Sequence, residues 1–199
     1  MIRKTIFFLL LALFSLFSYA EEINKRALES WLSISQKNIS SSLIKVIADQ
    51  VMIEKKKKGI DPAITLGIIK AESNYRTTAK SGYGAKGLMQ VVPRWHRDKI
   101  KGRNVYDPRT NIEVGTQVLY DCLNKRRGNL NAALNCYSGG AGKRYKTTIA
   151  NVKKEAREHM RVYAILNRPH EPTPVYAFDD GKNIKSSDIL TAFISQNDF

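Results

Sequence analysis

The sequence predicts a fold that is mainly α with a small β element, built as a single helical domain with a substrate groove. Two observations support the fold class: apolar residues recur at helical spacing in several segments, and most of those segments begin or end at capping residues. A third is that closely spaced glycines punctuate only one stretch, residues 81–92. The chain has 199 residues, enough for one domain with a substantial core.

The first twenty residues have the composition of a signal peptide. Arg3 and Lys4 precede an apolar run from Ile6 to Phe17, and residues 18–20 (Ser-Tyr-Ala) form a small-residue cleavage site. The run is short for a membrane span, although an uncleaved anchor is the alternative. We therefore expect a periplasmic or secreted protein with no stable membrane span after cleavage, in which residues 21–39 form an N-terminal extension.

The next two helices are predicted from their caps and apolar patterns. Serines at 40–42 precede an apolar stripe, and the helix should end at Gly59 after the run Lys55–Lys58, which we expect to be its solvated end. Asp61 and Pro62 then cap a helix that continues to about Ser73. This second helix is apolar nearly all round, which is typical of a helix inside a domain.

Three further helices and one irregular stretch complete the predicted domain. A helix should run from Asn111 to a stop at Gly128, a shorter one from Leu130 to Tyr137, and a third should carry one apolar face before Pro169. Residues 81–92 are the one place where strands are expected. Residues 171–199 are expected to be a C-terminal tail with one short helix near 189–194.

Charge and the metal-ligating residue types limit the function classes. The formal net charge is +15, which attracts polyanions, and in an exported protein these are the cell wall and lipid surfaces. An aromatic-and-basic nucleic-acid motif is not found, so no nucleic-acid partner is expected. His96, His159 and His170 are scattered without zinc-ligand spacing, so neither a metal nor a cofactor is expected. Cys122 and Cys136 either form a disulfide or are two small buried side chains.

Glu72 is the residue with the clearest chemical potential. It closes the apolar helix 62–73, where removal from water and the negative end of the helix dipole both favour its neutral form. A carboxylic acid that keeps its proton can protonate the leaving oxygen of a glycosidic bond. The alternative is a glutamate that extends into solvent where the helix emerges.

Four motifs then occur in order along the chain. They are residues 72–75 (Glu-Ser-Asn-Tyr), residues 84–90 (Gly-Ala-Lys-Gly-Leu-Met-Gln) with Pro93, residues 107–115 with their Asp-Pro and Asn-Ile pairs, and residues 132–140 (Ala-Ala-Leu-Asn-Cys-Tyr-Ser-Gly-Gly). Together they resemble the lytic transglycosylases, a branch of the lysozyme-like superfamily close to goose-type lysozyme. The resemblance covers roughly residues 40–150, and we expect a lysozyme-like α+β transglycosylase domain over residues 40–170.

The resemblance implies roles for four residues. Glu72 matches the catalytic acid, Ser81 and Gln90 match groove positions that hydrogen-bond the sugar, and Tyr137 matches the tyrosine whose hydroxyl lies near the catalytic carboxyl. Without the motif context, Ser81 and Gln90 are better interpreted as polar turn residues and Tyr137 as a core aromatic. The chain departs from the family pattern at two positions: Ser138 stands where asparagine is usual, and Val92 where methionine is common. A bridge between Cys122 and Cys136 would join two helices behind the groove.

The implied reaction cleaves the β-1,4 bond between N-acetylmuramic acid and N-acetylglucosamine and leaves 1,6-anhydro ends. Only Glu72 offers a catalytic carboxyl in the four motifs, which agrees with attack by the sugar's own hydroxyl; Asp61 is better explained as a cap and Asp107 as a turn residue. The expected partners are peptidoglycan glycan strands and an envelope secretion, conjugation or pilus apparatus. The alternatives are a lysozyme-type hydrolase on the same scaffold and an inactive cationic wall-binding protein.

Overall fold

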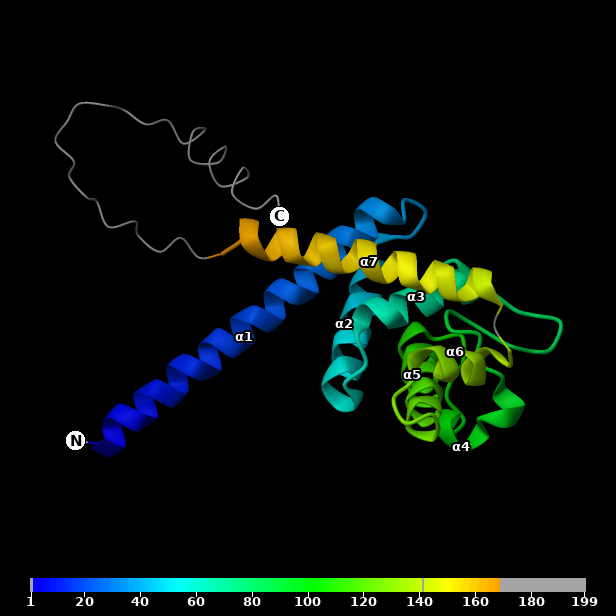
Figure 1. Cartoon of the computed structure of the whole chain (residues 1–199), viewed down its shortest axis with the longest axis horizontal. Coiled ribbons are helices and arrows are strands. Elements are labelled where there is room, and N and C mark those ends of the chain that lie inside the picture. The colour runs from blue at the N-terminus through cyan, green and yellow to red at the C-terminus, as the bar shows by residue number, and fades with distance from the viewer. Residues whose placement is uncertain (1, 141, 169–199) are drawn as a thin grey trace, which may run out of the picture. The chain divides into compact units, whose positions relative to one another are not determined.

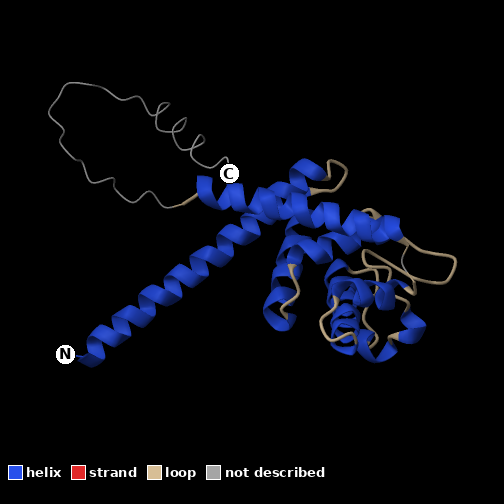
Figure 2. Cartoon of the chain, in the orientation of Figure 1, coloured by secondary structure: helices blue, strands red, loops and turns tan. Residues whose placement is uncertain are grey.

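The computed structural model describes residues 2–140 and 142–168, and helices dominate these ranges (Figures 1 and 2). The predicted mainly α fold is therefore confirmed. In chain order the elements are α1 (Ile2–Ser35), α2 (Ser41–Lys58), α3 (Pro62–Ser73), the 3-10 turn η1 (Pro93–Trp95), α4 (Arg97–Ile100), α5 (Pro108–Lys125), α6 (Leu130–Ser138) and α7 (Lys143–Leu166). The tail at 171–199, its expected helix and His170 lie outside the described residues.

The apolar helix α3 forms the middle of the core, as its composition predicts. It packs against α2 on one side and against α7 on the other. Gly67 makes the second contact possible, because a Cβ atom there would lie 2.9 Å from the Cα atom of Ile149 on α7. The close approach of α3 and α7 brings the start of α7 to the carboxyl end of α3, where Glu72 lies.

The predicted caps form, and one helix begins earlier than expected. The side chains of Ser40 and Asp61 accept hydrogen bonds from the backbone N–H groups of α2 and α3. Asp107, expected to be a turn residue, caps α5 by accepting from the N–H of Thr110 at 2.8 Å. The helix therefore starts at Pro108 rather than at Asn111, because proline suits the first turn of a helix.

The β element is smaller than a hairpin. Lys86 forms isolated antiparallel bridges with Lys80 and with Val91, and the described part of the chain has no longer ladder in this region. Gly84, Gly87 and Gln90 all have positive φ angles, of 84°, 77° and 49°. A left-handed residue turns the chain out of the extended path, so regular pairing cannot continue beyond each bridge.

Helix α1 contributes to the core well before residue 40. Leu28, Trp31 and Leu32 are buried, and α1 packs against α2 and α7. The helix continues unbroken across position 20, and cleavage there stays a prediction. Within the described ranges, no helix combines the length and the hydropathy that a membrane span needs.

Lys58 is not part of a solvated helix end, unlike the three lysines before it. Its side chain is only 9 % exposed, and its ammonium donates to the carboxylate of Glu54, which is fully buried. Gln50 and Thr116 donate to the same carboxylate at 2.8 and 3.1 Å. Each carboxylate oxygen of Glu54 therefore has partners, and the cluster joins α2 to α5.

Replacing Lys58 with methionine should destabilise the fold by about 3–5 kcal/mol, because the carboxylate of Glu54 would stay buried without its counter-ion. Lys57→Met is the matched control, since Lys57 is exposed, and should change stability by no more than about 0.5 kcal/mol. Urea unfolding at neutral pH measures both. Equal losses in the two variants would show that the cluster does not stabilise the fold.

The two cysteines form a disulfide, which settles the alternative left open by the sequence. Cys122 on α5 and Cys136 on α6 are bonded with a Cα–Cα distance of 5.8 Å, and they are 14 positions apart in the sequence. The bond fixes the short helix α6 against α5.

The double variant Cys122→Ala/Cys136→Ala should lose about 3 kcal/mol of stability, the usual figure for a disulfide that closes a loop of this length. Chemical denaturation with and without reductant measures the loss. The wild type should become as unstable as the double variant when reduced, whereas the double variant should not respond to reductant. Identical midpoints for all four samples would contradict the stabilising role.

Candidate active site

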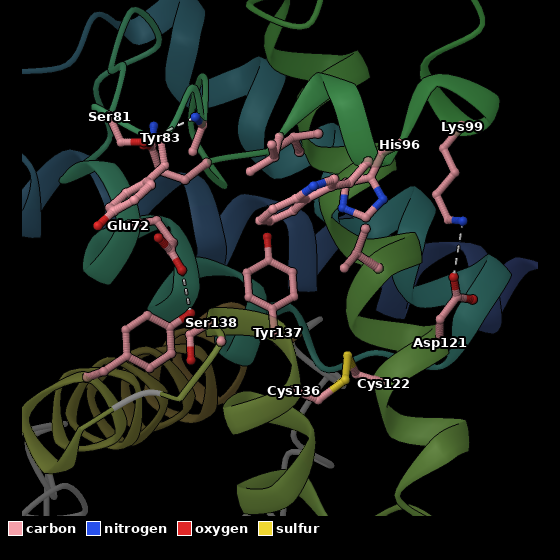
Figure 3. Close-up of a pocket in the computed structure, with 18 of the residues that line it drawn as sticks. Glu72, Ser81, Tyr83, His96, Lys99, Asp121, Cys122, Cys136, Tyr137 and Ser138 are labelled. Atoms are coloured by element: carbon pink, nitrogen blue, oxygen red, sulfur yellow. Dashed lines mark hydrogen bonds and ion pairs between the residues drawn. A yellow bond between two sulfur atoms is a disulfide. The ribbon is translucent and has the colours of Figure 1, made fainter.

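An open cleft of about 850 Å³ runs along one face of the helical domain (Figure 3). Its walls come from the carboxyl end of α3, the loop before η1, and helices α5, α6 and α7. This volume is in the range of sites that hold small molecules or segments of a polymer. All four residues selected from the sequence line this cleft: Glu72, Ser81, Gln90 and Tyr137.

Glu72 lies at the end of α3 and projects into the cleft (Figure 3). Burial raises the pKa of its carboxyl above the ordinary value, and a hydrogen bond from Tyr145 partly offsets this rise. The hydroxyl of Tyr145 donates to Oε1 of Glu72 at 2.7 Å. A carboxylic acid that faces a cleft with a raised pKa can give a proton to a bound molecule and later take one back.

Tyr145 is the site residue that sequence reasoning missed. It lies in the first turn of α7 and is the only described side chain with a hydrogen bond to Glu72. The apolar face of α7 was recognised from Ile149 onward, and extending that face back by four residues reaches Tyr145. Helical spacing could therefore have placed Tyr145 toward the core, but not its contact with Glu72.

Tyr137 lies next to Glu72 in the cleft but does not hydrogen-bond its carboxyl. Its hydroxyl donates instead to the backbone oxygen of Met89 at 2.7 Å. Burial raises the pKa of Tyr137 well above its usual value, and the nearby charge of Glu72 adds to the rise. The hydroxyl thus stays protonated and holds α6 to the loop that forms the opposite wall.

Gln90 is held in position by the loop around it. Its side-chain nitrogen donates to the backbone oxygens of Ala79 and Gly87, at 3.2 and 2.9 Å. The loop itself is tied to α5 by Asn111, which accepts from the N–H of Met89 at 2.7 Å and donates to the oxygen of Lys86 at 2.8 Å. These bonds use the nitrogen of Gln90, so its amide oxygen remains as the acceptor for a ligand.

Ser81 and Ser138 differ in what their hydroxyls can offer. Oγ of Ser81 accepts from the N–H of Ala85 at 3.1 Å, so its hydrogen can still be donated to a ligand. Oγ of Ser138 donates to the backbone oxygen of Leu134 at 2.8 Å, which uses its hydrogen within α6. The structure thus places all the predicted residues along one cleft, while the roles assigned to them stay predictions.

The far end of the cleft is lined by charged and aromatic residues. Lys99 forms an ion pair with Asp121 at 3.4 Å, and Figure 3 shows this pair across Tyr137 from Glu72. His96 lines the same end, and burial and the charge of Lys99 lower its pKa. Groups of three metal-ligating side chains are not found within residues 2–140 and 142–168.

The mainly α domain, with a partly buried carboxyl at the end of its central helix, defines the chain as a lysozyme-like helical domain. Residues 49–160, more than half of the sequence, match the model of the transglycosylase SLT domain family. The chain belongs to this family.

Named relatives agree with the assignment. The chain is 38 % identical over 81 residues to the "Transglycosylase" of Enterobacteria phage PRD1, covering 41 % of this chain and 30 % of the relative. It is 29 % identical over 153 residues to "Membrane-bound lytic murein transglycosylase C" of Mannheimia succiniciproducens, covering 63 % and 43 %. A protein of that name from Actinobacillus succinogenes is 36 % identical over 101 residues, covering 42 % and 28 %. The chain spans less than half the length of these relatives.

The variant Tyr145→Phe should raise the pKa of Glu72 further, because it removes the hydrogen bond that favours the carboxylate. NMR titration of the glutamate side-chain carboxyl carbons measures this shift, and the Glu72 signal is assigned by its absence in Glu72→Gln. Tyr163→Phe, farther along α7, is the control and should leave the titration unchanged. A lowered or unaltered pKa in Tyr145→Phe would refute the proposed electrostatic role.

Proposed function

We propose that this protein is a lytic transglycosylase that cleaves the β-1,4 bond between N-acetylmuramic acid and N-acetylglucosamine in peptidoglycan. The observation that carries the proposal is the raised pKa of Glu72 in a cleft large enough for several sugars. Membership of the SLT family and the names of its relatives support the same substrate class.

The reaction uses Glu72 twice. As a neutral acid, Glu72 protonates the glycosidic oxygen while the bond to the muramic C1 atom breaks. The resulting carboxylate then takes the proton from the muramic C6 hydroxyl, whose oxygen bonds to C1 and closes the 1,6-anhydro ring. Tyr145 keeps Oε1 oriented in both states, since its hydroxyl donates to that atom.

The arrangement of carboxyls favours this route over hydrolysis. Glycosidases that use water generally need a second carboxyl within about 5–9.5 Å of the first. Asp121 is the other carboxyl that lines the cleft among the described residues, and it pairs with Lys99 across Tyr137. Moreover, burial and the hydrogen bond from Tyr145 account for the shift in the pKa of Glu72, and no carboxylate of the described residues contributes to it.

Two alternatives predict different outcomes. A lysozyme-type hydrolase on the same scaffold would release ordinary reducing ends, whereas a transglycosylase releases anhydro ends that are lighter by one water. An inactive cationic wall-binding protein would release neither. The retention of Glu72, Gln90 and Tyr137 around one cleft favours an enzyme.

The cellular setting is inferred from the composition of the chain. The leader-like residues 1–20 and the net charge of +15 support action on the wall in the periplasm or outside the cell. A partner from a secretion, conjugation or pilus apparatus stays a prediction. Pull-downs from cell envelopes with the full-length protein and with a variant that lacks residues 171–199 test this prediction. An envelope protein captured only by the full-length protein would support recruitment of that partner through the tail. Capture of the same proteins by both would show that the tail does not recruit a partner.

Glu72→Gln should reduce the release of soluble fragments from purified peptidoglycan by roughly 10²–10⁴-fold, because the acid is removed at nearly constant shape. Mass spectrometry of wild-type digests should show anhydro-muropeptides. Glu158→Gln, an exposed residue of α7, is the control and should clear walls at the wild-type rate. Full clearing by Glu72→Gln would refute the assignment, and products with only reducing ends would indicate a hydrolase.

A further inference from the structure

Two aromatic side chains of the cleft are unusually exposed. Tyr83 is 83 % exposed and Trp95 is 64 % exposed, and both line the cleft that holds Glu72. Among the residues whose side-chain exposure the structure describes, which leave out most of residues 1–17, the third exposed aromatic is Tyr19 on α1. Large aromatic faces in water are a cost to solubility, and their gathering at one cleft indicates a binding surface.

Their surroundings suit a carbohydrate better than an apolar partner. Ser81 and Gln90 line the cleft with them, so aromatic faces and hydrogen-bonding groups share one surface. A pyranose ring has the same character, because its C–H face is apolar and its rim carries hydroxyls. An apolar protein segment would instead leave these polar groups without partners.

Trp95 is held by neighbouring groups while most of its side chain stays exposed. The guanidinium carbon of Arg94 lies 5.0 Å from the ring centroid, so a cation–π contact covers part of the indole. The short turn η1, which begins at Pro93, fixes the backbone at this point. A platform ordered before binding loses little entropy when a ligand stacks on it.

The two aromatic residues come from different segments of the cleft wall, since Tyr83 lies in the loop between α3 and η1 and Trp95 is the last residue of η1. Figure 3 shows Tyr83 on the same side of Tyr137 as Glu72. A glycan that lies along the cleft past Glu72 would therefore meet aromatic side chains from two separate segments of its wall.

We propose that Tyr83 and Trp95 are the sugar-stacking platforms of this cleft, which hold a β-1,4-linked glycan of several rings across Glu72. The inference rests on the proposed function, because it takes the substrate to be a glycan strand. It adds that recognition extends beyond the scissile bond, so the protein should prefer long strands to disaccharides.

The test uses a β-1,4-linked N-acetylglucosamine tetramer as the probe and Glu72→Gln as the background, so that nothing is cleaved. The chain has two tryptophans, and the other one, Trp31, is only 4 % exposed. Acrylamide quenching of fluorescence therefore reports mainly on Trp95. Saturating tetramer should reduce that quenching to near the level of Trp95→Phe, in which only the buried Trp31 emits.

Calorimetry completes the test in the same background. Trp95→Ala and Tyr83→Ala should each weaken tetramer binding about tenfold, while Trp95→Phe should lose much less. Ile34→Ala is the control, since Ile34 is also 64 % exposed but lies on α1 and does not line the cleft. With Glu72 restored, Trp95→Ala should raise the KM for glycan strands about tenfold and leave kcat within about twofold.

Two results would overturn the inference. One is tetramer binding that is unchanged in Trp95→Ala and Tyr83→Ala; if Glu72→Gln is nonetheless inactive, the proposed function survives and only the platforms fail. The other is an absence of tetramer binding in every variant. If tetramer binding is absent and Glu72→Gln still clears cell walls at the wild-type rate, both this inference and the proposed function fail. Products with reducing ends would instead show that the enzyme hydrolyses the glycan, and they would not contradict the sugar-stacking role of Tyr83 and Trp95.

Discussion

The removal of one carboxyl from water is the constraint on which the site depends. Glu72 can stay protonated because α3, whose end it occupies, is buried between α2 and α7. Gly67 allows α7 to approach, and the same approach delivers the hydroxyl of Tyr145 to Oε1. The packing that excludes water from the acid thus also supplies the donor that limits the rise of its pKa.

The opposite wall of the cleft depends on a buried amide rather than on a sheet. Asn111 is fully buried, and it bonds the backbone of the loop at Met89 and Lys86 and also the backbone oxygen of Val105, between α4 and α5. This loop carries Gln90, and its Met89 oxygen receives the hydroxyl of Tyr137. A chain of hydrogen bonds therefore connects α5, the loop and α6, which explains how a wall with only isolated β-bridges can hold its shape.

Local signals were predictable from the sequence, and contacts between distant segments were not. Caps such as Ser40 and Asp61 bond to backbone groups within one helical turn, so the start of each helix could be predicted from neighbouring residues in the sequence. The cleft residues were found through a family resemblance, and the roles of Ser81, Gln90 and Tyr137 stay predictions. Tyr145 lies 73 positions from Glu72, and the pairing of Lys58 inside the fold required α5 to cover it. Such contacts exist only after packing, which periodicity cannot specify.

The most direct measurement of the central claim is the free energy of unfolding of the wild type and of Glu72→Gln as a function of pH. A raised pKa means that the folded state binds the proton of Glu72 more tightly than the unfolded chain does. The wild type should therefore lose stability relative to Glu72→Gln as pH rises through the interval between the ordinary and the raised pKa, and the difference should level off above it. Curves that stay parallel across this interval, or a wild type that gains on the variant as pH rises, would contradict the claim.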